Sequence, residues 1–327
     1  MLKLPENFAQ KWEIHLAFRK KLNKYHSNKL YFYKHQKNRN NEHLNLGGIK
    51  MDHSQSDSQE KNTNRRAFLK KSAALTGGAF FAFSAFPVDS FADIIDANDP
   101  RLVTETIKYP GASGQMIAYM ARPKGNKKYP AIVVIHENRG LQPHIKDVTR
   151  RFALEGFVAL APDALSPQGG TPEKAEEIGP MFQKLDNEMT KKDFSAAVAY
   201  LKTNPQTTGK VGCTGFCWGG SMTNNVAVNT PDLDAAVPYY GGQPKAEDVA
   251  KIKAPMLLHY AGNDARINAG IPDFEAALKA AKVEYQLYMY EGAGHAFNND
   301  SNPERYNKEA ADLAWGRTIE FFKKKLK

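Results

Sequence analysis

Cysteine is scarce in this sequence, since the 327 residues include only Cys213 and Cys217. The two lie four positions apart in one extended segment, where a rise of about 3.3 Å per residue puts their Cα atoms roughly 13 Å apart. A disulfide needs Cα atoms within about 7 Å of each other. An intramolecular disulfide is therefore excluded, and Cys213 is expected to pack as a small apolar side chain on a strand.

The sequence also lacks a hydrophobic run long enough to cross a bilayer. The apolar stretch at residues 72–86 is only about 15 residues long, whereas a span needs about 20. An arginine pair, Arg65-Arg66, precedes this stretch, and a small-x-small sequence, Ser90-Phe91-Ala92, follows it. This order is typical of a twin-arginine signal peptide, which we predict at residues 51–92. The prediction implies export by the twin-arginine machinery and a periplasmic or secreted mature protein without a stable membrane span; an uncleaved anchor or a chance basic tail is the alternative.

Positive charge is concentrated near the amino end. Residues 1–92 contain about 16 Lys and Arg against about 7 Asp and Glu, whereas residues 93–327 are nearly balanced. The net charge of +10 therefore gives no reason to expect a nucleic-acid partner for the rest of the chain. Residues 1–50 are rich in Lys, His, Asn and Tyr and show no amphipathic period. We interpret them as a non-native or disordered extension ahead of a true start at Met51.

Residues 93–327 contain no internal repeat or low-complexity linker and are numerous enough for one domain with a sizeable core. Apolar β-rich runs alternate with helical patterns in this part of the chain. Strands are expected at residues 102–109, 115–121, 131–135, 157–161, 210–216, 235–239, 255–260 and 285–290, and helices around 143–155, 191–202, 218–228, 271–281 and 303–325. This alternation predicts an α/β fold with a mostly parallel central sheet and helices on both faces.

The segment at residues 215–219 reads Gly-Phe-Cys-Trp-Gly and lies between a β-rich run and a helical pattern. This is the strand–turn–helix setting of a nucleophile elbow, with cysteine in place of serine. Gly215 and Gly219 fit this interpretation, because side chains two positions either side of the nucleophile would collide in so tight a turn. Cys217 is the predicted nucleophile, and the helix that follows is expected to favour its thiolate. The alternative is a glycine-rich turn with a buried structural cysteine.

An acid and a histidine follow the last two expected strands. Asp264 comes just after the strand at residues 255–260, and His295 just after the strand at 285–290. Because parallel strands end at the same edge of a sheet, both should lie near Cys217, in the chain order of an α/β-hydrolase triad. His295 would act as base and then as acid, and Asp264 would orient its ring. Taken singly, Asp264 could be a loop or capping residue and His295 a surface residue.

Residues 133–140, Val-Val-Ile-His-Glu-Asn-Arg-Gly, end a central strand. In an α/β-hydrolase this loop supplies one backbone N–H of the oxyanion hole, and the residue after the nucleophile supplies the other. We assign these donors to Asn138 and Trp218. Glu137 should lie close to the thiol, either acting on it or simply tied to backbone amides as a buried carboxylate.

These motifs together resemble the dienelactone hydrolase family: Gly-Phe-Cys-Trp-Gly-Gly at the elbow, His-Glu before the oxyanion loop, and Gly-His-Ala-Phe around the histidine. The resemblance covers residues 93–327. It implies an α/β-hydrolase fold, no cofactor or metal, and hydrolysis of a small-molecule ester or lactone through an acyl-cysteine. It also implies that Glu137 contacts the resting thiol, and that Tyr239 lines the substrate pocket rather than being an ordinary core aromatic.

One position departs from the family pattern. Family members that cleave dienelactone hold the substrate carboxylate with arginines, one of them four residues after the catalytic histidine, where this sequence has Asn299. Residues 172–192 contain lysines but no arginine to replace the other. We therefore expect an exported hydrolase of a neutral ester or lactone. A broader thioesterase or carboxylesterase, and a non-catalytic binding module on the same scaffold, are the alternatives.

Overall fold

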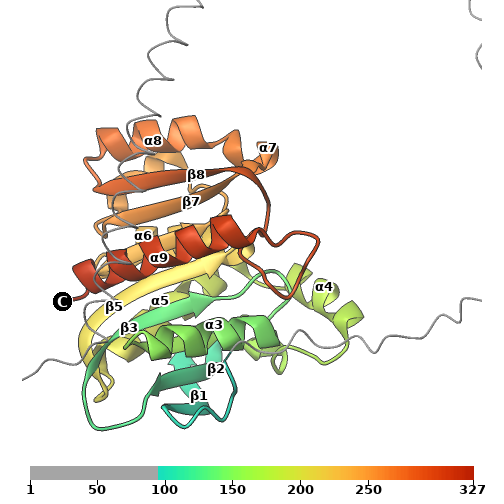
Figure 1. Ribbon diagram of the computed structural model, residues 1–327, viewed down its shortest axis with the longest axis vertical. Helices are drawn as coiled ribbons and strands as arrows, with labels where there is room; N and C mark the ends of the chain where they lie inside the picture. The colour runs from blue at the N-terminus through green and yellow to red at the C-terminus, as the bar shows by residue number, and fades with distance from the viewer. Residues whose placement is uncertain (1–94) are drawn as a thin grey trace, which may run out of the picture. The chain divides into compact units, whose positions relative to one another are not determined.

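The computed structural model describes residues 95–327, which form a central sheet covered by helices (Figure 1). The sheet has eight strands in the order β1-β2-β4-β3-β5-β6-β7-β8. Only β2 runs against the others, so the expected mostly parallel sheet is confirmed. The strands are β1 (Leu102–Gly111), β2 (Gly114–Pro123), β3 (Tyr129–Ile135), β4 (Val158–Pro162), β5 (Thr207–Phe216), β6 (Ala235–Tyr239), β7 (Met256–Asn263) and β8 (Tyr285–Gly294).

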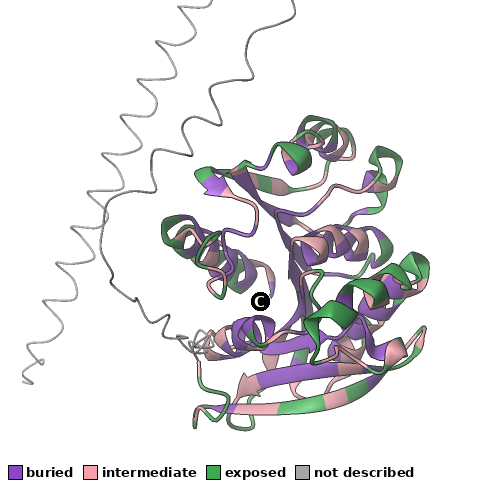
Figure 2. Ribbon diagram, turned by 90° about the vertical axis from the view of Figure 1, so that its right-hand side faces the viewer, coloured by how far each residue is buried: buried purple, intermediate pink, exposed green. Residues whose placement is uncertain are grey.

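Helices pack on both faces of this sheet. On one face, α3 (Pro143–Leu154) lies over β2, β3 and β4, and α9 (Lys308–Lys325) lies over β6 and β7. On the other, α5 (Asn187–Thr203) and α6 (Trp218–Asn229) pack against β5 and its neighbours, beside α8 (Ile271–Ala280). Each face has its own apolar core, and Figure 2 shows the buried residues along the strands and the inward sides of the helices. The remaining short elements are α4 (Ala175–Gln183), α7 (Ala265–Asn268), η1 (Ser166–Gln168) and η2 (Ala246–Lys251).

Several boundaries differ from the sequence expectation because of local hydrogen bonds. The last helix begins at Lys308 instead of residue 303, since the Asn307 side chain accepts from the Ala310 N–H at 3.1 Å and caps it. Asp186 caps α5 in the same way and starts it at Asn187. The helix α4 was not expected as a separate element. Strand β8 continues to Gly294 and so delivers His295 directly from the sheet.

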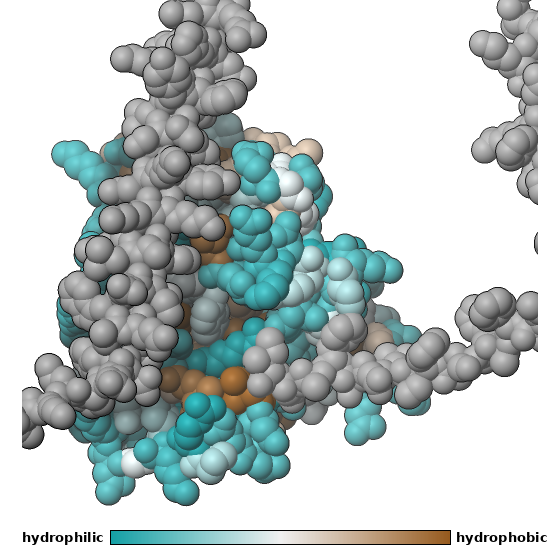
Figure 3. Space-filling view, in the orientation of Figure 1, coloured by the Kyte–Doolittle hydropathy of each residue, from teal (hydrophilic) through white to brown (hydrophobic). Residues whose placement is uncertain are grey.

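Two sequence predictions concern residues that the structure does not describe. The extension at residues 1–50 and the signal peptide at 51–92 both fall outside the described range. Within residues 95–327, no helix has both the length and the apolar character needed to cross a membrane. On the face drawn in Figure 3, the surface that grey atoms leave visible is largely hydrophilic.

Candidate active site

The turn between β5 and α6 holds Cys217 in a conformation that non-glycine residues rarely adopt, with φ 56° and ψ −113°. The Cys217 N–H donates to the Tyr239 carbonyl at 3.1 Å and ties the turn to the end of β6. A Cβ added at Gly215 would fall on the backbone of Gly219, and one added at Gly219 would fall on the carbonyl oxygens at the end of β3. The expected steric need for both glycines is confirmed.

The edge of the sheet brings Asp264 and His295 together. Asn263 at the end of β7 pairs with Gly294 at the end of β8, so the next residue of each strand lies side by side. His295 Nδ1 donates to Asp264 Oδ2 at 2.5 Å. Asp264 is buried, and His295 is partly exposed. With Nδ1 committed to the carboxylate, Nε2 remains as the acceptor, which is the arrangement a general base needs.

The loop after β3 is held in place by the buried His136. Its Nδ1 donates to the Glu137 carbonyl at 2.6 Å, and its Nε2 accepts from the Ala164 N–H at 3.0 Å. Its ring stacks on that of Trp218, with centroids 5.5 Å apart. Burial lowers the pKa of His136, so the ring stays neutral and can make both bonds. His136 thus connects the loop after β3 to Trp218, the first residue of α6, a role that the sequence did not indicate.

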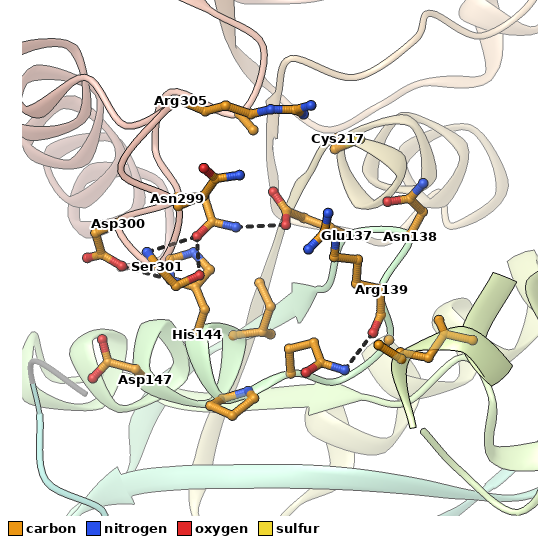
Figure 4. A pocket seen from close by; sticks show the side chains of 18 of the residues that line it. Glu137, Asn138, Arg139, His144, Asp147, Cys217, Asn299, Asp300, Ser301 and Arg305 are labelled. Carbon is orange, nitrogen blue, oxygen red and sulfur yellow. Dashed lines mark hydrogen bonds and ion pairs between the residues drawn. The ribbon is translucent and has the colours of Figure 1, made fainter. Parts of the chain in front are cut away.

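One pocket brings most of the predicted residues together (Figure 4). It has a volume of 1330 Å³ and lies beyond the carboxyl ends of the central strands. Asp264 does not line the pocket itself but bonds His295, which does. The backbone N–H of Trp218 faces the Cys217 sulfur. Within residues 95–327, no group of three His, Cys, Asp or Glu side chains is arranged to hold a metal ion. The lining includes Glu137, Asn138, Cys217, His295, Asn299 and Arg305.

Comparison with known proteins identifies the family. The model of the dienelactone hydrolase family matches residues 116–326. The chain belongs to the dienelactone hydrolase family. Membership in it makes the protein a hydrolase that acts on ester bonds and confirms the α/β-hydrolase fold.

The alignments with two bacterial relatives cover nearly the whole length of those proteins. The chain is 36% identical over 276 residues to a Methylorubrum extorquens protein and 32% identical over 265 residues to an Escherichia coli protein, both named "Putative carboxymethylenebutenolidase". These alignments cover 80% and 76% of this chain and 92% and 97% of the two relatives. The crystal structure of a "Putative Dienelactone Hydrolase" from Klebsiella pneumoniae is 29% identical, with a TM-score of 0.62 over 68% of this chain and 98% of that one.

The ionisation of Cys217 differs from the sequence expectation. Desolvation by burial, together with the nearby Glu137 carboxylate, raises the pKa of the Cys217 thiol, although the Trp218 N–H acts in the opposite direction. The expected preference for thiolate at the amino end of α6 is therefore wrong for the resting protein. Cys213 has no exposed surface, and burial raises its pKa to about 12. Both cysteines are free.

Tyr239 does not lie where the sequence analysis expected it. It is fully buried, does not line the pocket, and its hydroxyl is 2.6 Å from the Thr318 hydroxyl of α9. The structure supports the alternative interpretation, in which Tyr239 is an ordinary core aromatic. The neighbouring Tyr240 has φ 37° and packs its ring edge-on against His295, with centroids 5.1 Å apart. A left-handed residue directly after a strand could not be read from the sequence.

Asn299 occupies the family's arginine position and contacts Glu137. Its Nδ2 donates to Glu137 Oε2 at 2.8 Å, a bond drawn in Figure 4. Two arginines, Arg139 and Arg305, line the same pocket from exposed positions. The sequence marks Asn299 only by the missing charge. Arg139 lies in the segment at residues 133–140, but no pattern in the sequence indicated that it or Arg305 would line the pocket.

The close contact at the elbow predicts that Gly219→Ala strongly destabilises the folded protein. The new Cβ would meet backbone oxygens, which cannot move aside, and overpacking of this kind costs about 1–3 kcal/mol or more. We expect the free energy of unfolding in urea to fall by about 3 kcal/mol. Gly316→Ala in α9 is the matched control, because its Cβ enters open space and alanine favours a helix by about 1 kcal/mol. Equal stability of the two variants would contradict the proposed steric role.

The raised pKa of Cys217 predicts slow alkylation of the resting thiol at neutral pH. We expect its rate with iodoacetamide to reach half its maximum above the value for free cysteine, about 8.5. Glu137→Gln removes a negative charge that disfavours thiolate, so the midpoint should move to lower pH. Labelling is followed by peptide mass spectrometry, with the buried Cys213 as an internal control that stays unmodified. A midpoint unchanged by Glu137→Gln would contradict this electrostatic coupling.

Proposed function

We propose that the protein hydrolyses a neutral ester or lactone through an acyl-enzyme on Cys217. The observation that carries the proposal is the 2.5 Å bond between His295 and Asp264, in the same pocket as a cysteine held on a strained turn at the start of α6. Backbone strain of this kind persists at functional sites, where the surrounding structure fixes it. A retired scaffold would not be expected to keep all three side chains in place.

The chemistry follows from the groups that face the pocket. His295 Nε2 takes the proton of the Cys217 thiol as the sulfur attacks the ester carbonyl, and the carbonyl electron pair moves to its oxygen. The backbone N–H groups of Asn138 and Trp218 are the proposed donors to that oxyanion, each contributing about 3 kcal/mol to lowering the barrier. When the C–O bond breaks, His295 returns its proton to the leaving oxygen. Water then cleaves the acyl-sulfur bond with His295 as base, and the thiol is restored.

A neutral substrate is favoured by the charge beside the sulfur. Glu137 lies close enough to disfavour the thiolate, and the side chain bonded to it, Asn299, carries no charge. A substrate carboxylate beside the sulfur would therefore meet repulsion without a bidentate partner. Arg139 and Arg305 line the pocket from exposed positions, whereas Asn299, at the family's arginine position, is buried beside Glu137.

The size of the pocket favours a second candidate, a broader carboxylesterase or thioesterase. Sites for small ligands commonly occupy about 300–1,000 Å³. The volume of 1330 Å³ exceeds this range and leaves room for acyl and leaving groups larger than a simple lactone. A panel of lactones, p-nitrophenyl esters and thioesters, each with and without a carboxylate, separates the candidates by kcat/KM.

Substitutions of the three proposed catalytic side chains should affect turnover to different degrees. Cys217→Ala should abolish it, a loss of roughly a million-fold by comparison with other triads, and His295→Ala should nearly do so. Asp264→Asn should cost less, on the order of ten-thousand-fold. The measurement is kcat on the best neutral substrate of the panel. Full activity of Cys217→Ala would exclude the acyl-cysteine, and a preference for carboxylate-bearing substrates would exclude the neutral class.

Export through the twin-arginine route is part of the proposal and rests on the sequence at residues 51–92. We expect the mature protein to begin near Asp93, just before the described residues. Amino-terminal sequencing or intact mass of the protein from its native cells tests this. Recovery of a chain that retains residues 1–50 would contradict both the export signal and the start at Met51.

A further inference from the structure

The Glu137 carboxylate is held by one oxygen only. Oε2 accepts from Asn299 at 2.8 Å, whereas Oε1 is buried and has no hydrogen-bond partner among the described residues. Leaving a buried carboxylate oxygen without a donor is costly. The pocket nevertheless keeps it, and Cys217 lines the same pocket (Figure 4).

Ser301 fixes which way the Asn299 amide points. The Ser301 N–H donates to Asn299 Oδ1 at 3.0 Å, and the Ser301 hydroxyl donates to the same atom at 2.6 Å. A backbone N–H can only donate, so the atom that faces it must be the amide oxygen. The amide nitrogen must then face Glu137. This assignment follows from the chemistry of the donors and does not depend on telling oxygen from nitrogen in the side chain.

Two sets of bonds fix the loop that carries Asn299. The Asn299 N–H donates to the carbonyl of Ala296, the residue after His295, at 3.0 Å. Asp300 bonds His144 Nδ1 of α3 at 2.9 Å and Arg151 of the same helix at 2.5 Å. The loop therefore holds the amide at a set distance from both the imidazole and the oxyanion loop.

We propose that Asn299, locked by Ser301, is a positioning residue: it holds one oxygen of Glu137 and so keeps the other beside the Cys217 thiol. The inference rests on the proposed function in taking Cys217 as the reactive thiol. The amide is a neutral donor, so it fixes the carboxylate without cancelling its charge. The negative charge of Glu137 then acts on the sulfur in full, and the resting thiol stays protonated.

Other charged and titratable groups also face the thiol and are common to every variant in the test. Asp264 and Arg266, which follow β7, act on it with opposite signs. His295 follows β8, and Tyr240 follows β6. Only the effect of Glu137 on the Cys217 thiol should depend on Asn299, because the Asn299 amide bonds Glu137 and none of these other groups.

The test is the pH dependence of Cys217 alkylation by iodoacetamide in the full-length protein, which requires no turnover. Asn299→Ala releases Glu137, so the midpoint should shift to lower pH, in the same direction as in Glu137→Gln. In the double variant Glu137→Gln/Asn299→Ala, the loss of Asn299 should cause no further shift. Ser301→Ala should give a smaller shift in the same direction, because the backbone N–H still holds the amide.

Asn302→Ala is the matched control, since Asn302 joins the same loop through backbone hydrogen bonds; its midpoint should equal that of the wild type. An unchanged or raised midpoint in Asn299→Ala, or a further shift in the double variant, would overturn the proposal. If Asn299→Ala does not fold, Ser301→Ala decides, because its exposed side chain tolerates truncation. Ester hydrolysis by the wild type and by Cys217→Ala is measured in parallel, so failure of the proposed function is recognised separately.

Discussion

The left-handed backbone of Cys217 is the constraint on which the site depends. It turns the chain from β5 into α6 so sharply that the sulfur lies at the rim of the sheet and the first N–H of the helix faces it. The turn can form only because two neighbouring positions have no side chain, and Gly219 brings α6 against the carbonyls that end β3. The strain at one residue thus sets how close the Cys217 sulfur comes to the loop proposed to stabilise the oxyanion.

The other components of the site depend on the pairing of β7 with β8. Their register places Asn263 opposite Gly294, and the bond between Asp264 and His295 follows from it. The chain beyond β8 then turns back toward the loop after β3, where Asn299 contacts Glu137. His295, the candidate base, and Asn299, which bonds Glu137, therefore belong to one short segment.

Much of this arrangement could be predicted from the sequence, because it follows from local rules. The glycine spacing indicates the elbow, and an acid and a histidine just after consecutive parallel strands must lie near its edge. Three features could not be predicted, because they depend on packing between distant segments. The direction of the Cys217 pKa shift is set by burial and by Glu137, some 80 positions away along the chain. The contacts of Tyr239 with α9, and the orientation of the Asn299 amide, require knowledge of tertiary neighbours.

The protonated state of the resting sulfur also affects how the protein withstands damage. Peroxides and disulfides react with thiolates much faster than with thiols. A thiol whose burial and acidic neighbour disfavour the loss of its proton is a poor target for both. The second cysteine offers no resolving partner, since Cys213 is inaccessible and turned into the core. In the periplasmic or secreted setting that we propose, this thiol is therefore expected to oxidise slowly.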